Sequence, residues 1–217
     1  MKKGYFITVE GVEGVGKSTN IAAIEAKLSS EGISYISTRE PGGTPLSEKI
    51  RNILLDKNET NMSDMAELLL VFAARSQHVE ELIKPALDSG KWVICDRFTD
   101  SSFAYQGYGR ETDIDVIEKV ERTALGEFTP DLTFLLDLPV EIGLERAGKR
   151  GELDRFEAED LDFFNRVRNG FLKRAEADRF LVIDASKALS EVEKEITSAL
   201  GVWIKNWTKN RTMDGLQ

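Results

Sequence analysis

The chain has 217 residues and a net charge of −9. This length suits one domain with a substantial apolar core. The acidic balance disfavours nucleic acid and anionic membranes as partners, because both require a basic surface. The sequence has no apolar run long enough to span a membrane and no apolar signal core behind its N-terminus, so we expect a cytoplasmic protein.

Strand-like and helix-like segments alternate along the chain. Apolar runs predict strands at 5–10, 33–38, 91–96, 131–138 and 179–184. Amphipathic segments predict helices at 17–30, 45–55, 63–89, 113–125, 140–148, 158–177 and 189–207. We expect Pro85 to bend or interrupt the long third helix, and the polar tail at 208–217 to fray. The alternation predicts a single α/β domain over residues 1–217, with a five-stranded parallel sheet flanked by helices.

A glycine-rich turn follows the first predicted strand. Residues 11–18, GVEGVGKS, fit the pattern G-x-x-x-x-G-K-[ST] between a strand and a helix. The glycines let successive backbone N–H groups point at a phosphate, and the helix N-terminus adds partial positive charge. We therefore predict a nucleoside triphosphate site in which Lys17 reaches the phosphates and Ser18 ligates Mg²⁺. The site comprises Gly11, Val12, Glu13, Gly14, Val15, Gly16, Lys17, Ser18 and Thr19.

Charged residues follow several of the predicted strands. Asp96 ends the third strand, where a carboxylate can hold Mg²⁺. Ligands of open α/β folds bind at the carboxyl edge of the sheet, and an anionic acceptor there is indicated by Arg39, Arg51, Arg75 and Arg97. The basic, glycine-flanked stretch at 147–157 predicts a lid that closes over the transferred group. A solvated charged loop is the alternative interpretation of that stretch.

Three classes of protein use such a phosphate loop: GTPase switches, motors and kinases. The sequence contains neither a D-x-x-G segment nor an [NT]-K-x-D guanine reader, which disfavours the switch. A motor usually needs a partner-coupling domain. A kinase with a phosphate acceptor needs no general base, only positioning and charge neutralisation. Phosphoryl transfer to a phosphorylated acceptor is therefore favoured, and a nucleotide-dependent binding switch without fast turnover is the alternative of a different class.

The sequence resembles the bacterial thymidylate kinases from Phe6 to about Trp207. The matching motifs are EGVEGVGKS at 10–18, TREPGGT at 38–44, DRF at 96–98, AYQG at 104–107 and RGELDR at 150–155. The resemblance implies a P-loop NTPase fold with a short lid at about 147–157. It implies Mg²⁺-dependent transfer of the ATP γ-phosphoryl group to dTMP, giving dTDP for dTTP biosynthesis. It also implies a homodimer, for which the apolar residues of 64–83 are available. Another monophosphate kinase, acting on dUMP or CMP, is the alternative of the same class.

The resemblance also implies roles for individual residues. Gly14 occupies the place where one branch of the family carries an arginine, and Arg150 in the lid supplies the cation instead. Lys17, Arg97 and Arg150 are the implied catalytic residues, and Ser18 and Asp96 the implied metal ligands. The implied acceptor-binding residues are Glu13, Arg39, Arg51, Phe72, Arg75, Arg97, Ser101, Ser102, Tyr105 and Gln106.

The third helix leaves one choice open. Family members commonly place an aromatic residue four positions before the arginine that corresponds to Arg75, whereas Val71 is found here and Phe72 follows it. Both positions can lie near the arginine on a helix, so either Phe72 stacks on the base or Val71 forms an apolar wall. We interpret His78, the only histidine, as a surface or interface residue, because the reaction needs no base.

Overall fold

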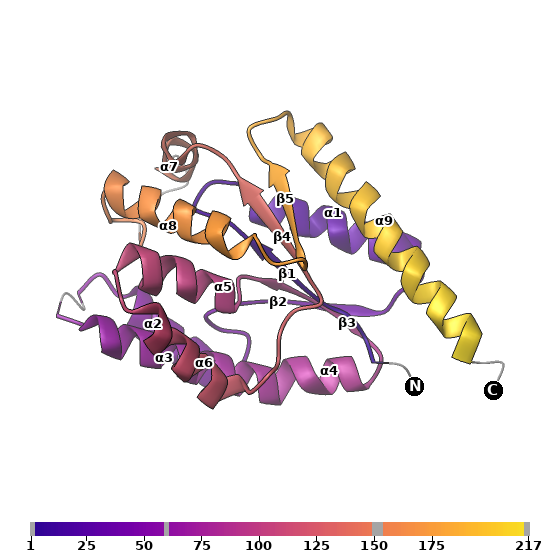
Figure 1. Ribbon diagram of the computed structural model, residues 1–217, viewed down its shortest axis with the longest axis horizontal. Coiled ribbons are helices and arrows are strands. Elements are labelled where there is room, and N and C mark those ends of the chain that lie inside the picture. The colour runs from indigo at the N-terminus through magenta and orange to yellow at the C-terminus, as the bar shows by residue number, and fades with distance from the viewer. Residues whose placement is uncertain (1–2, 59–60, 149–153, 215–217) are drawn as a thin grey trace.

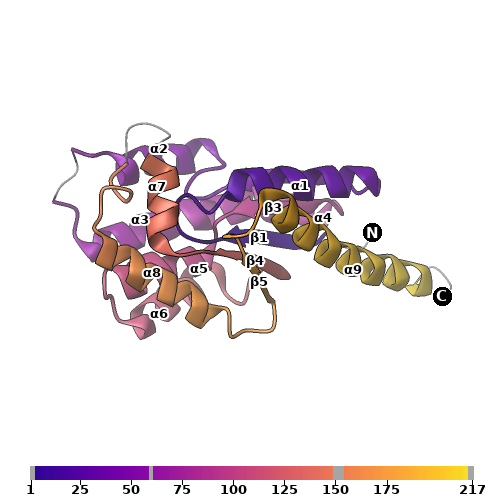
Figure 2. The same ribbon diagram turned by 90° about the horizontal axis from the view of Figure 1, so that it is seen from above.

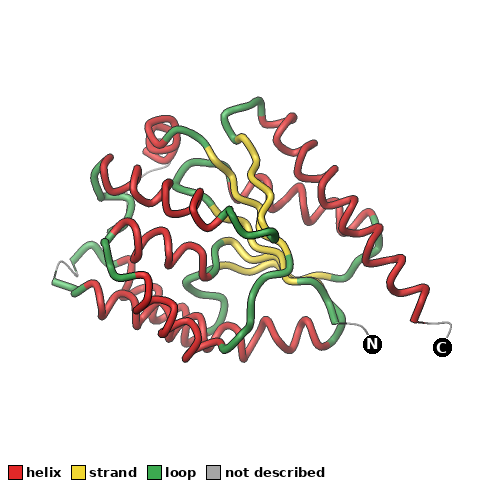
Figure 3. Tube along the Cα trace, in the orientation of Figure 1, coloured by secondary structure: helices red, strands yellow, loops and turns green. Residues whose placement is uncertain are grey.

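The computed structural model describes residues 3–58, 61–148 and 154–214. In this part of the chain the strands lie together in one sheet among the helices (Figure 3). The sheet is parallel and its strand order is β2-β3-β1-β4-β5. The strands are β1 (Phe6–Glu10), β2 (Tyr35–Arg39), β3 (Trp92–Asp96), β4 (Leu132–Asp137) and β5 (Phe180–Asp184). Each strand begins and ends close to its predicted range, and the predicted five-stranded parallel α/β fold is confirmed.

The sheet is buried on both faces. Ile7 and Val9 of β1 belong to one apolar core, and Phe6 belongs to the other. The helices α1 (Lys17–Ser30) and α9 (Leu189–Asp214) lie side by side over the first face. The second face is covered by α3 (Asp64–His78), α4 (Lys84–Asp88) and α6 (Ile114–Leu125) (Figure 1). Because the three central strands β1, β3 and β4 are buried on both faces, they read as apolar runs in the sequence.

The remaining helices surround the carboxyl edge of the sheet. They are α2 (Pro45–Leu55), α5 (Thr99–Ser102), α7 (Val140–Gly148) and α8 (Leu161–Arg174). Two π-helical segments are also present, η1 (Val79–Ile83) between α3 and α4, and η2 (Phe103–Gly109) after α5. Pro85 interrupts the α-helical pattern as predicted, since the wider π turn precedes the residue that lacks a backbone donor.

Two segments differ from the sequence prediction. The last helix continues to Asp214 instead of ending near 207, because residues 208–214 include no glycine or proline. Residues 99–109 form α5 and η2, although the sequence predicts no helix there. This short, glycine-containing segment packs along α8 (Figure 2), and tertiary packing of this kind stabilises helices that are marginal alone.

No helix in the described ranges is long and apolar enough to cross a membrane.

The register of the central strands brings the functional loops together. Asp96 at the end of β3 pairs with Val9 of β1 and with Arg39 of β2. The loops that follow these three strands therefore leave the sheet at one edge. The glycine-rich turn, the TREPGGT segment and Arg97 meet there, as expected for an open parallel sheet.

Candidate functional site

The glycine-rich loop turns sharply between β1 and α1. Gly11, Gly14 and Gly16 have φ angles of 137°, 71° and 89°, which residues with side chains rarely adopt. The Nζ atom of Lys17 donates to two carbonyl oxygens of the loop, each 3.1 Å away. Burial, and then repulsion from Arg97, lowers the pKa of Lys17 to about 8. Among the described residues no carboxylate lies within hydrogen-bonding distance of this cation, so Lys17 is suited to bind an anion.

Asp96 lies beside this loop and fits a role in holding a divalent cation. Its Oδ1 atom is buried and has no hydrogen-bond partner in the described part of the chain. Its charge also favours the charged form of Lys17. The exposed Ser18 stands in the first turn of α1. Among the residues described, no three His, Cys, Asp or Glu side chains form a metal-binding group. A magnesium ion here would therefore complete its coordination with phosphate oxygens and water, as Mg²⁺ commonly does.

The Arg97 side chain contacts both the glycine-rich loop and the segment η2. Its backbone has a φ of 70°, and its guanidinium donates to the Gly11 carbonyl and to Oε1 of Glu13, both at 2.9 Å. The same guanidinium lies 5.0 Å from the centroid of the Tyr105 ring. The Tyr105 hydroxyl donates to the Glu13 carboxylate at 2.7 Å. One carboxylate thus orients both an arginine and a tyrosine.

A cavity of about 150 Å³ opens beside Arg97. Its walls come from the loops after β1, β2 and β3, from α2, α3, α5 and η2, and from the segment before α8. All the predicted acceptor-binding residues except Phe72 line it: Glu13, Arg39, Arg51, Arg75, Arg97, Ser101, Ser102, Tyr105 and Gln106. The tertiary structure therefore brings these dispersed positions into one site.

Arg39 and Arg51 add positive charge to the cavity wall. The guanidinium of Arg39 pairs with both carboxylate oxygens of Glu48, at 2.7 and 3.1 Å, and the hydrogen bonds lower the pKa of Glu48. Arg51 donates to the carbonyl of Pro41 at 2.7 Å, and burial lowers its pKa. Desolvation of a cation favours its pairing with an anionic ligand.

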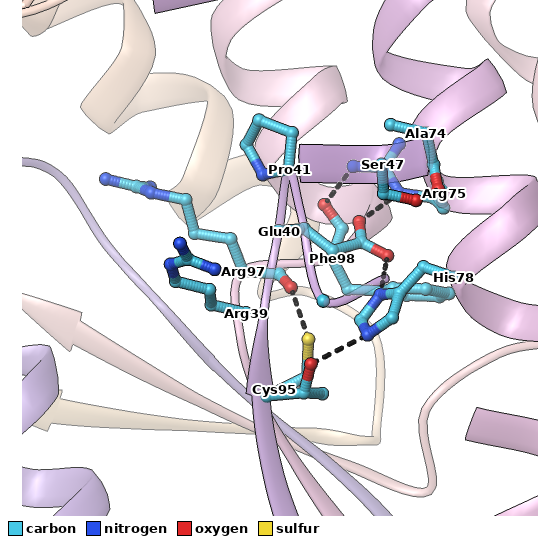
Figure 4. A network of polar contacts seen from close by, with 12 residues as sticks. Arg39, Glu40, Pro41, Ser47, Ala74, Arg75, His78, Cys95, Arg97 and Phe98 are labelled. Carbon is cyan, nitrogen blue, oxygen red and sulfur yellow. Dashed lines mark hydrogen bonds and ion pairs between the residues drawn. The ribbon is translucent and has the colours of Figure 1, made fainter. Parts of the chain in front are cut away.

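Arg75 is held in a buried polar network (Figure 4). Its Nε donates to Oε2 of Glu40 at 2.6 Å, and one terminal nitrogen donates to the Ser102 hydroxyl at 2.8 Å. The other oxygen of Glu40 lies 3.0 Å from Nδ1 of His78, whose Nε2 is 2.8 Å from the Thr38 hydroxyl. The interpretation of His78 as a surface residue is therefore wrong. Its ring is fully buried, because both nitrogens find polar partners inside the protein.

The structure also decides between Val71 and Phe72. Val71 lines the cavity, whereas Phe72 belongs to the core, and its ring centroid is 4.7 Å from the Arg75 guanidinium. Consecutive helical residues point roughly 100° apart, so only one of the two faces the cavity. Phe72 does not line this cavity, and its ring packs against the Arg75 guanidinium instead. Phe156, which the sequence analysis missed, is an aromatic residue in the wall.

The lid prediction can be followed only in part. α7 ends at Gly148 and the description resumes at Asp154, so Arg150 lies outside the described residues. Asp154 and Phe156 line the cavity, and the Phe156 ring meets that of Tyr105 edge-on at 6.0 Å. An isolated aromatic residue inside a charged stretch is the sequence signal that marks Phe156.

Glu10, at the end of β1, begins the EGVEGVGKS motif, but the sequence assigned it no role. Its carboxylate accepts hydrogen bonds from the Phe98 backbone N–H at 2.7 Å and the Ser101 hydroxyl at 2.6 Å. It therefore positions the start of α5, which carries part of the cavity wall. Complete burial, with a further contribution from Asp100, raises the pKa of Glu10 to about 7.

The phosphate loop and α7 approach each other closely at two glycines, Gly14 and Gly143. A Cβ atom on Gly14 would lie 1.9 Å from the Gly143 carbonyl oxygen, and a Cβ on Gly143 would lie 2.5 Å from the Glu13 carbonyl oxygen. Real Cβ atoms do not approach other atoms so closely. The contact leaves no space for an arginine at position 14, and it holds the helix that leads into the lid against the loop.

A strand, a glycine-rich phosphate loop and a helix, followed in space by an aspartate on the neighbouring strand, define the class of P-loop nucleotide-binding proteins. Comparison with known proteins identifies one family within this class. The family described as Thymidylate kinase matches residues 9–196.

The relatives agree with this match over nearly the whole chain. The thymidylate kinase of Teredinibacter turnerae is 53% identical over 203 residues, which cover 93% of this chain and 99% of that protein. A Pseudomonas fluorescens thymidylate kinase is 53% identical over 199 residues, covering 91% and 95%. The crystal structure of thymidylate kinase from Ehrlichia chaffeensis aligns with a TM-score of 0.73 and 34% identity, covering 92% and 99% of the two chains. The chain belongs to the thymidylate kinase family.

We expect Gly143→Ala to weaken binding of Mg-ATP about 10- to 100-fold, because the new methyl group displaces either the phosphate loop or α7. Gly148→Ala is the matched control: it makes the same change in the same helix, where a Cβ meets nothing within 4 Å. Calorimetric titration of both variants measures the difference. Equal affinities in two folded variants would contradict the proposed contact.

Glu10 makes stability depend on pH. The folded protein holds the Glu10 proton more tightly than the unfolded chain, so stability falls as pH rises from about 4.5 to about 7. Glu10→Gln keeps an acceptor for Phe98 and a donor for Ser101 but does not ionise. Between pH 5.5 and 8 we expect this variant to lose about 2 kcal/mol less stability than the wild type. Urea unfolding at both pH values measures this, with the exposed Glu31→Gln as control, and parallel pH dependences would refute it.

Proposed function

We propose that the protein transfers the γ-phosphoryl group of ATP to the phosphate of dTMP, giving dTDP for dTTP biosynthesis. Membership of the thymidylate kinase family supports this reaction. The observation that carries it is the cavity beside the phosphate loop, whose wall combines Arg39, Arg51 and Arg97 with apolar and polar groups suited to a nucleoside. A reaction that consumes ATP and supplies nucleotides for DNA synthesis is expected in the cytoplasm.

The donor nucleotide is assigned to the glycine-rich loop. Backbone N–H groups of the loop and the N-terminus of α1 bind its phosphates, and Lys17 leaves the loop carbonyls to contact them. Ser18 and Asp96 are the proposed ligands of Mg²⁺. When bound, the ion neutralises charge on the phosphate oxygens. The loop itself contributes orientation, because its backbone is already curved around the phosphate position.

The acceptor is assigned to the cavity. Arg39, Arg51 and Arg97 bind its phosphate, since a guanidinium offers paired donors to phosphate oxygens. Tyr105, held by Glu13, lies against the sugar, where its ring leaves little room for a 2′-hydroxyl. Arg75 donates to a carbonyl of the base, and Val71 and Phe156 exclude water from its faces.

Phosphoryl transfer between two anions requires positioning and cations rather than a base. Lys17 and Arg97 supply charge from the loop and from β3. Arg150 is proposed to complete the set from the lid, since the Gly14 contact with α7 excludes an arginine within the loop.

The acceptor assignment is tested by ADP release with Mg-ATP and dTMP, dUMP, UMP, CMP, AMP or GMP. We expect dTMP to be strongly preferred. Lys17→Ala should lower turnover with dTMP by about two to three orders of magnitude, because it removes a cation from the transferring group. Equal use of another monophosphate would overturn the base assignment. If the wild type transferred phosphate to none of them, the nucleotide-dependent switch would be the better function.

We also propose a homodimer formed through α2 and α3. Exposed apolar side chains gather on these two adjacent helices: Leu46 and Ile53 on α2, and Met65 and Leu69 on α3. Apolar groups exposed in this way on neighbouring helices favour burial against a second copy.

Leu69→Glu is expected to shift the protein from dimer to monomer in sedimentation velocity, because it places a charge inside the interface. Leu189→Glu is the matched control, since Leu189 on α9 is exposed to a similar extent, 52% against 51% for Leu69. A dimeric Leu69→Glu variant, or a monomeric wild type, would argue against this interface.

A further inference from the structure

Glu67 is a buried carboxylate to which the sequence motifs assign no role. It lies on α3 with its side chain 1% exposed, and each of its oxygens has defined partners. Oε1 accepts a hydrogen bond from Nε2 of Gln106 at 2.8 Å. Oε2 lies 2.7 Å from a terminal nitrogen of Arg155 and 3.5 Å from Nε of Arg110. The two arginines compensate the charge of this buried carboxylate.

This contact determines the orientation of the Gln106 side chain. A carboxylate only accepts hydrogen bonds, whereas a carboxamide has an N–H₂ end and a carbonyl end. The N–H₂ end of Gln106 must therefore face Glu67. Its carbonyl oxygen has no partner in the described part of the chain, and Gln106 lines the cavity. This carbonyl oxygen of Gln106 is not among the buried side-chain atoms that lack a partner. It is therefore accessible as a hydrogen-bond acceptor for a ligand in the cavity.

Arg75 provides the complementary group in the same cavity. Its guanidinium carries five N–H groups, and its hydrogen bonds go to Glu40, Ser102 and the Phe98 carbonyl. N–H groups are therefore left for a ligand. An acceptor on Gln106 and a donor on Arg75 match a base that presents an N–H beside a carbonyl. Thymine and uracil have this imide edge, whereas cytosine has an unprotonated nitrogen beside an amino group.

We propose that Glu67 is a specificity-determining positioning residue, which holds the Gln106 carbonyl oxygen toward the cavity and thereby selects pyrimidines with an imide edge. This inference rests on the proposed function, because it concerns how the acceptor cavity reads its base. Glu67 does not touch the substrate. It acts through Gln106, and it excludes cytosine because a fixed carbonyl oxygen repels the unprotonated ring nitrogen.

The test is the ratio of kcat/KM for dTMP to kcat/KM for dCMP. In Glu67→Gln the new carboxamide can accept from Gln106 or donate to it, so Gln106 can turn its N–H₂ group toward the cavity. We expect the dTMP-to-dCMP ratio to fall about tenfold or more. A site that hydrogen-bonds the imide edge of thymine rejects cytosine strongly only if its polar groups keep a fixed orientation. A ratio equal to that of the wild type would overturn the proposal.

The ratio of kcat/KM for dTMP to kcat/KM for dCMP distinguishes the positioning of Gln106 by Glu67 from a purely structural role of Glu67. Glu67 also contacts Arg155, which lies in the predicted lid range 147–157 and donates to the Leu54 carbonyl at 2.8 Å. Its substitution can therefore change turnover with every acceptor, but such a change cancels in the ratio. Glu159→Gln is the matched control. It removes a half-buried carboxylate that lies 2.5 Å from Arg110, and it has no contact with Gln106. Its ratio should equal that of the wild type, and a tenfold fall there would refute the assignment to Glu67.

A double-mutant cycle shows whether Glu67 acts through Gln106. Gln106→Ala should lower the ratio by itself, and adding Glu67→Gln to it should have no further effect on the ratio. Additive effects would overturn the proposal.

One measurement needs no variant. The wild type should lose turnover with the N3-methyl analogue of dTMP, which lacks the N–H donor, and full activity with this analogue would also overturn the inference. A wild type that phosphorylates dTMP while the Glu67→Gln ratio stays unchanged refutes only the role of Glu67. A wild type that phosphorylates no monophosphate refutes the proposed function as well.

Discussion

The parallel register of β1, β2 and β3 is the constraint on which the site depends. Asp96 is in register with both Val9 and Arg39, so the three loops after these strands leave the sheet together. Residues far apart in sequence thereby share one small volume. Glu10 strengthens this arrangement, because its buried carboxylate joins the end of β1 to the start of α5 at 2.7 Å. The neighbouring strands β1 and β3 therefore position both the phosphate loop, which follows β1, and the part of the cavity wall that follows β3.

Three further buried carboxylates organise the cavity of this acidic protein. Glu13 orients Arg97 and Tyr105, and Glu40 orients Arg75 together with His78. Glu67, in turn, orients Gln106 and contacts two arginines. In each case the carboxylate pairs with a group that lines the cavity, and Glu13 and Glu40 line it as well. A net charge of −9 is therefore compatible with anion binding, because these acidic groups are paired with cations or with hydrogen-bond donors.

α7 and the segment at 154–157 contact the surrounding elements in different ways. On the donor side, α7 meets the phosphate loop through the backbones of Gly14 and Gly143. On the acceptor side, Arg155 reaches Glu67 and the end of α2, while Phe156 meets Tyr105. The contact between Gly14 and Gly143 is one of close backbone packing, whereas Arg155 makes an ion pair and Phe156 an aromatic contact. Both described segments that border the predicted lid are therefore held near the place where the two nucleotides are proposed to meet.

The sequence by itself determined the strands, most helices, the phosphate loop and the family, because periodicity and contiguous motifs are local properties. It also identified most residues of the cavity wall. Only the tertiary structure decided that Val71 rather than Phe72 lines the cavity, that His78 is buried, and that Glu10 and Glu67 matter. These outcomes depend on which distant side chains share a buried space. Likewise, α5 and η2 form because α8 packs on them, and a local pattern carries no information about that contact.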